Sequence, residues 1–272
     1  MTPTQDKALE YLSKVQYMTI AQMIEMDVFK SESTARRHLK DLVERGFLNV
    51  QNFGVQVGVG KLPSLYGLTP KSVQYIADNF YISPENIKIS KSHKEIKAYR
   101  DFYHRVGLID SLLAIYRYLE SLKTADIWSE LYFRKHGEHA KKRTAIDLLD
   151  GSRLEPDAIL HFTDPIANRK RLYLIEFYED SEQVERIRRA LIRHGEAIAT
   201  GKPSESLNLT VGHRVLLIFR HEHTARAISR YLQEAEEFRA IQDRFLITTH
   251  NAIKTNPFTN WIDGKGENLT LF

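Results

Sequence analysis

Two acidic side chains stand at ends of neighbouring apolar runs where they could hold a metal ion together. Asp157 opens the run 157–162, and Glu176 lies near the end of the run 172–177. If these runs pair as a β-hairpin, both carboxylates face one cavity. Mg²⁺ or Mn²⁺ would then be bound by the two carboxylates, water and phosphate oxygens. Glu130, on an earlier apolar run, could complete the metal shell.

This arrangement resembles the PD-(D/E)xK pattern of restriction-type nucleases, with one departure. The lysine that the pattern has two positions after the glutamate is replaced by Tyr178, which supplies no permanent cation. Three arginines on the following helix could substitute for it: Arg186, Arg188 and Arg189. The resemblance implies metal-dependent DNA cleavage with Asp157 and Glu176 as catalytic residues. The alternatives are a catalytically inactive domain, or acids that are only solvated or salt-bridged.

A second group of polar side chains, nearer the N-terminus, could contact DNA. Thr19 with Gln22, and then Ser31, are predicted caps of two helices that follow a first helix at 4–15. Two strands, 47–53 and 65–68, come next and are joined by a glycine-bearing loop. This order predicts a winged helix-turn-helix, whose third helix enters the major groove. The predicted DNA contacts are Ser33, Thr34, Arg36, Arg37, Lys40 and, in the loop, Lys61. The alternatives are a solvated helix face or a protein-binding winged helix.

The excess positive charge is concentrated in two short segments. The 272-residue chain has 39 Lys and Arg against 35 Asp and Glu, a net charge of +4, whereas residues 1–87 contain nine of each kind. Residues 88–105 carry six basic against two acidic side chains, and residues 134–143 carry five against one. The first segment predicts part of an amphipathic helix with its lysines in solvent. The further predicted phosphate contacts are Lys94, Lys97, Arg134, Lys141, Lys142 and Arg143.

The pattern of apolar residues predicts three parts. Residues 1–83 are the winged-helix domain and residues 84–125 a basic connector helix. In residues 126–272, short apolar runs are followed by helical stretches at 181–198 and 224–238. That order is typical of a mixed sheet with helices packed on it. The predicted fold class is therefore α+β or α/β, a winged helix followed by a restriction-endonuclease-like mixed-sheet domain.

Composition excludes several classes of protein. The absence of cysteine excludes disulfides, thiolate zinc sites and thiol nucleophiles, and is typical of a reducing compartment. No run approaches the ~18 apolar residues of a membrane span, and no basic start precedes an apolar run. We therefore expect a soluble cytoplasmic protein without a membrane partner.

A pair of histidines resembles another kind of metal site but departs from it. His221 and His223 precede Tyr231, an order similar to that of tyrosine relaxases. That class has a bulky apolar residue between its histidines, and Glu222 stands there in this chain. We therefore do not assign a metal site to this pair.

The order of motifs resembles that of the replication-relaxation family of plasmids. The resemblance follows the predicted winged helix and then five segments: 104–110, 154–160, 174–177, 214–219 and 245–249. It implies action on plasmid or mobile-element DNA, with Asp157 and Glu176 at the acidic positions of the sheet. Tyr178 departs from the acid or lysine that the family has two residues after the glutamate, and Arg188, Arg189 and His194 depart from the lysine and tyrosine of its next helix.

The resemblance leads to three hypotheses. The first is a protein of replication or mobilisation that binds double-stranded DNA, with a degenerate nuclease-like domain. Other replication or mobilisation proteins, or further copies of the chain, would be its protein partners. The second hypothesis is a Mg²⁺- or Mn²⁺-dependent nickase that uses Asp157 and Glu176. The third is a regulator of transcription or copy number.

Overall fold

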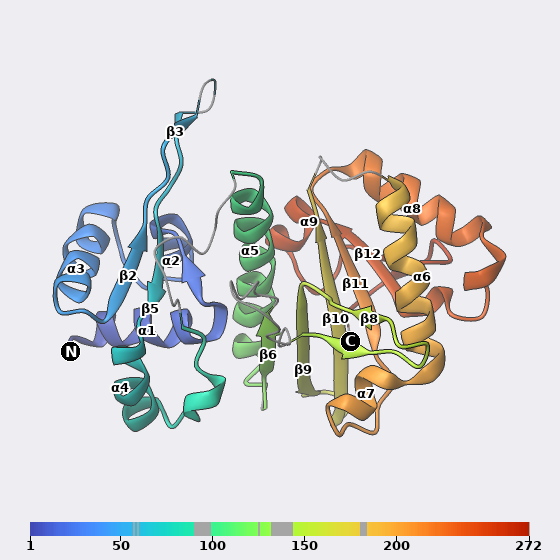
Figure 1. Ribbon diagram of the computed structural model, residues 1–272, viewed down its shortest axis with the longest axis horizontal. Helices are drawn as coiled ribbons and strands as arrows, with labels where there is room; N and C mark the ends of the chain where they lie inside the picture. Colours follow the sequence, from blue (N-terminus) through green and yellow to red (C-terminus); the bar gives the residue numbers. More distant parts are fainter. Residues whose placement is uncertain are drawn as a thin grey trace. The chain divides into compact units, whose positions relative to one another are not determined.

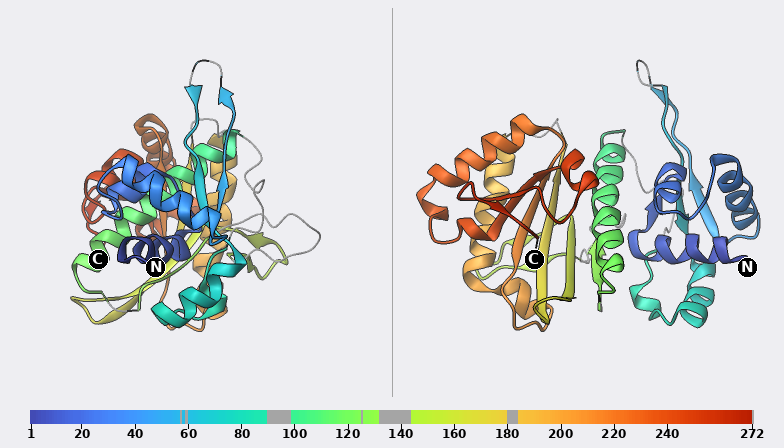
Figure 2. Two further views of the ribbon diagram at one scale, coloured as in Figure 1. Left: turned by 90° about the vertical axis from the view of Figure 1, so that its left-hand side faces the viewer. Right: turned by 180° about the vertical axis from the view of Figure 1, so that it is seen from behind.

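A computed structural model of the chain describes residues 1–56, 58, 60–89, 99–124, 126–131, 144–179 and 184–271. The chain divides into two compact units, Met1–Phe102 and Tyr103–Phe272, and each is described by itself (Figures 1 and 2). Within the described ranges, no helix is long and apolar enough to span a membrane.

The helices of the first unit begin at side chains that cap them. These helices are α1 (Pro3–Val15), α2 (Ile20–Glu25), α3 (Glu32–Glu44) and α4 (Pro70–Phe80), followed by a 3₁₀ turn at Pro84–Asn86. The Thr19 hydroxyl accepts from the Gln22 amide, and the Gln22 side chain accepts from the Thr19 amide. Ser31 accepts from the Thr34 amide at the start of α3. Both predicted caps are therefore confirmed, and each satisfies amides that have no partner within the helix.

A three-stranded antiparallel sheet completes the core of the first unit. Its order is β1–β5–β2, formed by Tyr17–Met18, Leu65–Leu68 and Leu48–Gln51. The predicted strands at 47–53 and 65–68 are confirmed as β2 and β5, whereas the two-residue β1 was not predicted. Between them, β3 (Val55–Gln56) and β4 (Gly60–Lys61) pair as a hairpin that projects from the helices (Figure 1).

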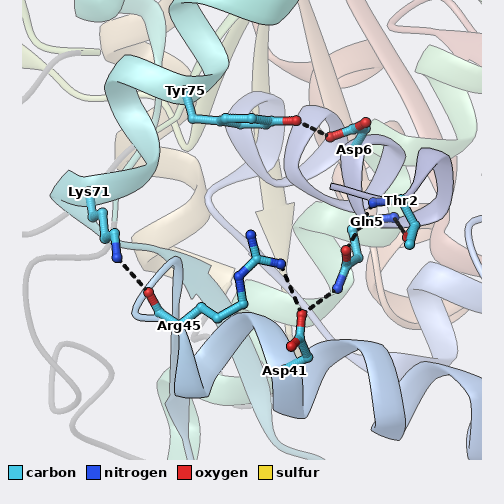
Figure 3. Close-up of polar contacts among 7 residues, drawn as sticks. All are labelled: Thr2, Gln5, Asp6, Asp41, Arg45, Lys71 and Tyr75. Carbon is cyan, nitrogen blue, oxygen red and sulfur yellow. Dashed lines mark hydrogen bonds and ion pairs between the residues drawn. The ribbon is translucent and has the colours of Figure 1, made fainter.

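Polar contacts fasten α3 to the first helix of the unit (Figure 3). Asp41 on α3 accepts from Gln5 Nε2 on α1 at 2.8 Å and from Arg45 Nη1 at 3.1 Å. These two hydrogen bonds are the main reason that the pKa of Asp41 is lowered. The Tyr75 hydroxyl on α4 donates to Asp6 on α1 at 2.6 Å. The helix α3 is thus held to α1, and its opposite face remains exposed.

The prediction that Lys88 lies on the connector helix is wrong. Lys88 and Ile89 are not helical. The Lys88 amide donates to the Ser13 carbonyl at 3.2 Å, and Ile89 forms a parallel bridge with Leu68. The Lys88 side chain is buried rather than in solvent. Pairing with the first unit therefore overrides the helical pattern here, and α5 spans Tyr99–Ser121, so that the division between the units falls within it.

The second unit is built on a mixed sheet, seven-stranded in the described part of the chain. Its order is β14–β13–β12–β11–β10–β9–β6. The strands are β6 (Trp128–Leu131), β9 (Ala158–Asp164), β10 (Arg169–Tyr178), β11 (Arg214–Phe219), β12 (Phe245–Thr249), β13 (Trp261–Asp263) and β14 (Asn268–Leu269). Strands β10, β11 and β12 are parallel, and the other neighbours are antiparallel. The predicted mixed α/β sheet is confirmed.

Helices cover both faces of this sheet (Figures 1 and 2). The face that bears Tyr178 and Phe219 is covered by α6 (Val184–Thr200) and α8 (Glu222–Glu234). Because successive residues of a strand point to opposite faces, Phe177 points to the other side, where it meets Gly107 of α5. The smaller elements are β7 (Ile146–Asp147), β8 (Arg153–Leu154), α7 (Lys202–Ser206), α9 (His250–Thr255) and 3₁₀ turns at Glu236–Phe238 and Gln242–Arg244.

Candidate functional sites

The third helix of the first unit separates an apolar face from a polar one. Ala35, Leu39 and Leu42 are fully buried. The predicted contact residues lie on the other side: Ser33, Arg36, Arg37 and Lys40 are exposed, and Thr34 is half-buried. The sequence pattern therefore placed this face correctly in solvent.

Charged side chains on this face differ in their partners. Arg36 forms a close ion pair with Glu32 one turn before it, and Lys40 Nζ lies 3.6 Å from Glu44 Oε1 one turn after it. Arg37 has no ion-pair partner among the described residues. Arg37 is consequently the basic side chain of α3 that reaches solvent with its charge uncompensated.

Lys61 lies on the projecting hairpin, and other predicted contacts fall outside the described chain. Lys61, opposite Val55 in the β3–β4 pair, is exposed and has no ion-pair partner in the ranges that the structure describes. The predicted contacts that lie outside the described residues are Lys94, Lys97, Arg134, Lys141, Lys142 and Arg143.

Asp157 and Glu176 are brought to one end of an antiparallel strand pair. The β9–β10 ladder runs to Ala158 opposite Ile175, so Asp157 and Glu176 are the next residue on each strand. The hairpin on which the prediction depended is therefore present. Both side chains are largely buried, with 15% and 12% of their surface exposed.

The Asp157 carboxylate is held by a histidine and by the backbone. Its Oδ2 atom accepts from the Phe177 amide at 2.9 Å and lies 3.1 Å from Nε2 of His104 on α5. Burial raises the pKa of Asp157, but the charge and hydrogen bond of His104, the Phe177 amide and the charge of Arg105 together lower it below its usual value. Asp157 is therefore an anion, oriented by α5 and by β10.

The Glu176 carboxylate meets a histidine from α6. Its Oε1 atom lies 2.7 Å from Nε2 of His194, whose side chain has no exposed surface. Burial, and after it the charge of His213, lowers the pKa of His194 to about 3. The imidazole is therefore neutral and donates its Nε2 hydrogen to Glu176. His194 is thus an α6 side chain that contacts Glu176.

Tyr178 and those arginines have other surroundings. Tyr178 is buried in the core, where its ring stacks on Phe219 at 5.1 Å between centroids. Arg188 lies over the ring of Tyr231 at 4.6 Å, while Arg186 and Arg189 are exposed.

Among the described residues, Glu130 does not form a three-carboxylate group with Asp157 and Glu176. Glu130 lies opposite Ile159 in the β6–β9 pair, two residues further along β9 than Asp157, and its Oε1 accepts from the Leu131 amide at 3.2 Å. Oxygen atoms of Asp157 and Glu176 already accept hydrogen bonds. In the described part of the chain, no three His, Asp or Glu side chains are grouped so as to hold a metal ion.

Sequence reasoning missed the histidines that hold the two carboxylates. His104 belongs to the segment 104–110, which was recognised as a motif without a role for its members. In that segment Gly107 lets α5 approach Phe177: a β carbon there would lie 2.2 Å from the Phe177 ring. His194 was noted only as a departure from the family pattern. Residues that make contact between a helix and a sheet have no fixed spacing in sequence. The sequence around these histidines therefore predicts the apolar periodicity of the helices but not the contacts.

The pair His221 and His223 does not resemble a metal site in three dimensions. Both are exposed at the start of α8, and their rings stack on each other with centroids 5.7 Å apart. The Tyr231 hydroxyl donates to Glu237 at 3.1 Å.

Together these features define a two-unit α/β protein with a basic helical face in one unit and histidine-bound carboxylates at a sheet edge in the other. The chain belongs to the replication-relaxation family, whose family model matches residues 9–208. The match includes α3, Asp157 and Glu176, and it indicates a role in replication or mobilisation. Neither the curated proteins nor the solved structures provide a match to this chain.

Proposed function

We propose that the protein binds duplex DNA during replication or mobilisation of a plasmid or other mobile element. The observation that carries this proposal is the exposed polar face of α3, with Ser33, Arg36, Arg37 and Lys40 opposite a fully buried apolar face. Membership of the replication-relaxation family supports the biological role.

In this proposal the first unit is a winged helix. Its α3 is the recognition helix in the major groove, and the β3–β4 hairpin is the wing, whose Lys61 contacts a phosphate. Arg37 is the principal contact on α3, because its charge is available without breaking an ion pair. To contact DNA, Arg36 and Lys40 must first break their ion pairs with Glu32 and Glu44.

The second unit is, in this proposal, a degenerate restriction-endonuclease-like domain that does not cleave DNA. The β9–β10 hairpin with Asp157 and Glu176 supports the likeness to that fold. The burial of Tyr178 in the core and the contact of Glu176 with His194 support loss of cleavage. The protein would then bind DNA and assemble with further copies or with other replication and mobilisation proteins. A regulator of transcription or copy number would use the same α3 surface.

Binding to a duplex at several salt concentrations tests the proposal. Arg37→Ala should weaken binding about tenfold, since one charge-assisted contact is lost, and should reduce the slope of log K against log salt by about 0.9. Arg230→Ala is the matched control, because Arg230 is an exposed arginine of the second unit. Equal affinity and slope for the wild type and Arg37→Ala would contradict a contact through α3.

Incubation with a supercoiled plasmid and Mg²⁺ or Mn²⁺ separates binding from cleavage. We expect a plasmid that stays supercoiled at protein concentrations that saturate binding. Nicking by the wild type that is lost in Glu176→Ala would instead establish the alternative, a metal-dependent nickase. Nicking that survives Glu176→Ala would contradict both the binding-only proposal and the carboxylate mechanism.

A further inference from the structure

Arg220 is a basic side chain held at the same sheet edge as Asp157 and Glu176. It directly follows β11, one residue beyond the last pair of the β10–β11 ladder, Tyr178 and Phe219. Its amide donates to the Tyr178 carbonyl at 2.9 Å, which extends the ladder and fixes its backbone. The side chain is half-buried, and no carboxylate partner is found for it among the described residues.

A buried histidine holds the guanidinium of Arg220. Arg220 Nη1 lies 3.1 Å from Nδ1 of His250, the first residue of α9. A guanidinium can only donate, so Nδ1 accepts and the proton of the neutral ring is on Nε2. That Nε2 lies 3.2 Å from Oδ2 of Asp110 on α5 but without the geometry of a hydrogen bond. His250 is only 5% exposed, so the packing around the ring fixes it, and the ring in turn positions Arg220.

Phe177 links this arrangement to Asp157. Its ring makes edge contacts with His250 and with His104, at centroid distances of 5.5 Å and 5.7 Å. The amide of the same Phe177 donates to Asp157, which His104 also contacts. Arg220 is therefore part of one continuous set of contacts that runs from Asp157 through Phe177 to β11.

The partners of Arg220 leave its charge available. A neutral imidazole accepts one hydrogen bond but does not neutralise a guanidinium, which has further N–H donors in a planar arrangement. That arrangement matches two oxygens of a phosphate. Because the side chain is already oriented, little conformational entropy is lost when an anion binds. Arg220 thus supplies, just beyond the neighbouring strand β11, a permanent positive charge that Tyr178 cannot supply.

We infer that Arg220 binds a phosphodiester group of a DNA strand at this sheet edge, with His250 as a positioning residue. The inference rests on the proposed function, because it takes DNA as the ligand. It adds a strand-binding site in the second unit, beyond the segment that matches the family model, which ends at residue 208.

A single-stranded probe tests this site in the full-length chain. The probe is a fluorescein-labelled oligothymidine of about 15 nucleotides, within the range of known single-strand site sizes. Binding is measured by anisotropy in an Arg37→Ala background, so that the first unit contributes little. Arg220→Gln should weaken binding about tenfold and reduce the salt slope by about 0.7. Arg226→Gln is the matched control, because Arg226 is exposed and pairs with Glu222.

Two further variants test the positioning role of His250. His250→Gln retains an acceptor for Arg220 and should keep the salt slope of the parent protein. His250→Leu removes the acceptor and should lower both affinity and slope toward those of Arg220→Gln. Thermal unfolding of each variant is followed in parallel. Equal loss in both His250 variants with an unchanged slope would show a structural effect and overturn the positioning role.

Neutral and free phosphates identify the ligand. An oligothymidine with methylphosphonate linkages should bind equally to the parent and to Arg220→Gln, because it lacks the charge. A difference that persists with this probe would overturn a phosphodiester contact. Stabilisation by inorganic phosphate that depends on Arg220, without any effect on the oligonucleotide, would overturn DNA as the ligand. If Arg220→Gln left oligothymidine binding unchanged while duplex binding was normal, this inference alone would be overturned. If Arg37→Ala left duplex binding unchanged, the proposed function would be overturned.

Discussion

Glu176 accepts its hydrogen bond from a histidine, His194, whose side chain has no exposed surface, at 2.7 Å. The contact joins the third turn of α6 to the end of β10. His194 Nδ1 has no hydrogen-bond partner within the described residues, so a second proton on the ring would be buried without an acceptor there. The contact is therefore a hydrogen bond from a neutral imidazole to a carboxylate rather than an ion pair.

Stability should fall as the pH is lowered through the range in which free histidine titrates. Burial lowers the pKa of His194 to about 3 and that of His213 to about 4, whereas an unfolded chain has histidines near 6.5. Above about pH 6.5 both states are neutral at these positions and nothing is lost. Below it the unfolded state binds protons that the folded state does not, so the free energy of unfolding decreases toward pH 4.

Urea unfolding between pH 7.5 and pH 4 measures this effect. His194→Gln keeps a donor for Glu176 without a titrating ring, so its stability should depend less steeply on pH than that of the wild type. His223→Gln, at an exposed position, should retain the steep dependence. Parallel pH curves for the wild type and His194→Gln would contradict a buried neutral His194.

Replacing Gly107 should weaken the packing of α5 on the sheet. A β carbon at this position would lie 2.2 Å from Cζ of Phe177, a ring that is fully buried. Gly107→Ala should therefore lower the free energy of unfolding by about 1–3 kcal/mol through overpacking. Chemical denaturation of the variant checks this.

Gly195 offers a matched control for that substitution. It also lies inside a helix, α6, but its β carbon would be 3.4 Å from the nearest atom, in Phe238. Gly195→Ala should be neutral or stabilising by up to about 1 kcal/mol, since alanine favours helix. A loss of stability in Gly195→Ala equal to that in Gly107→Ala would show that contact with Phe177 is not the cause.

Local patterns in the sequence predicted the elements well and their mutual contacts less well. The caps at Thr19 and Ser31 depend on neighbouring amides, and they were found where the sequence placed them. Alternation and apolar runs also predicted the β9–β10 pair that carries Asp157 and Glu176. Lys88 was wrongly placed in a helix because its backbone pairs with Ser13, far away in sequence. For the same reason the histidine partners of the carboxylates could not be predicted, because they come from helices on either side of the sheet.

Asp164 should stabilise the turn between β9 and β10. Its carboxylate accepts from the Ile166 and Ala167 amides and from the Arg171 guanidinium. Burial raises the pKa of Asp164, but these donors lower it overall. The Asp164 and Arg171 side chains are only 2% and 15% exposed, and removing one charge of a buried pair costs about 3 kcal/mol. Asp164→Asn should therefore lose about that much stability in urea unfolding.

An exposed ion pair in the same unit is the control for Asp164. Asp147 pairs with Arg153 at 2.9 Å, but about half of each side chain is exposed, 53% and 48%. Asp147→Asn should change stability by less than about 0.5 kcal/mol. If Asp164→Asn were equally mild, the turn contacts would not contribute as described.

His104 should control the ionisation of Asp157. Burial raises the pKa of this carboxyl, and the nearby His104, by its charge and hydrogen bond, is the largest of the influences that bring it below the usual value. His104→Gln retains an N–H donor but cannot carry charge, so the pKa of Asp157 should rise. Carboxyl carbon chemical shifts followed by NMR through an acid titration measure it. Asp164, whose lowered pKa is due to donors other than His104, is the control and should titrate identically in both proteins. If the pKa of Asp157 were also unchanged in His104→Gln, His104 would not be the residue that keeps this carboxylate ionised.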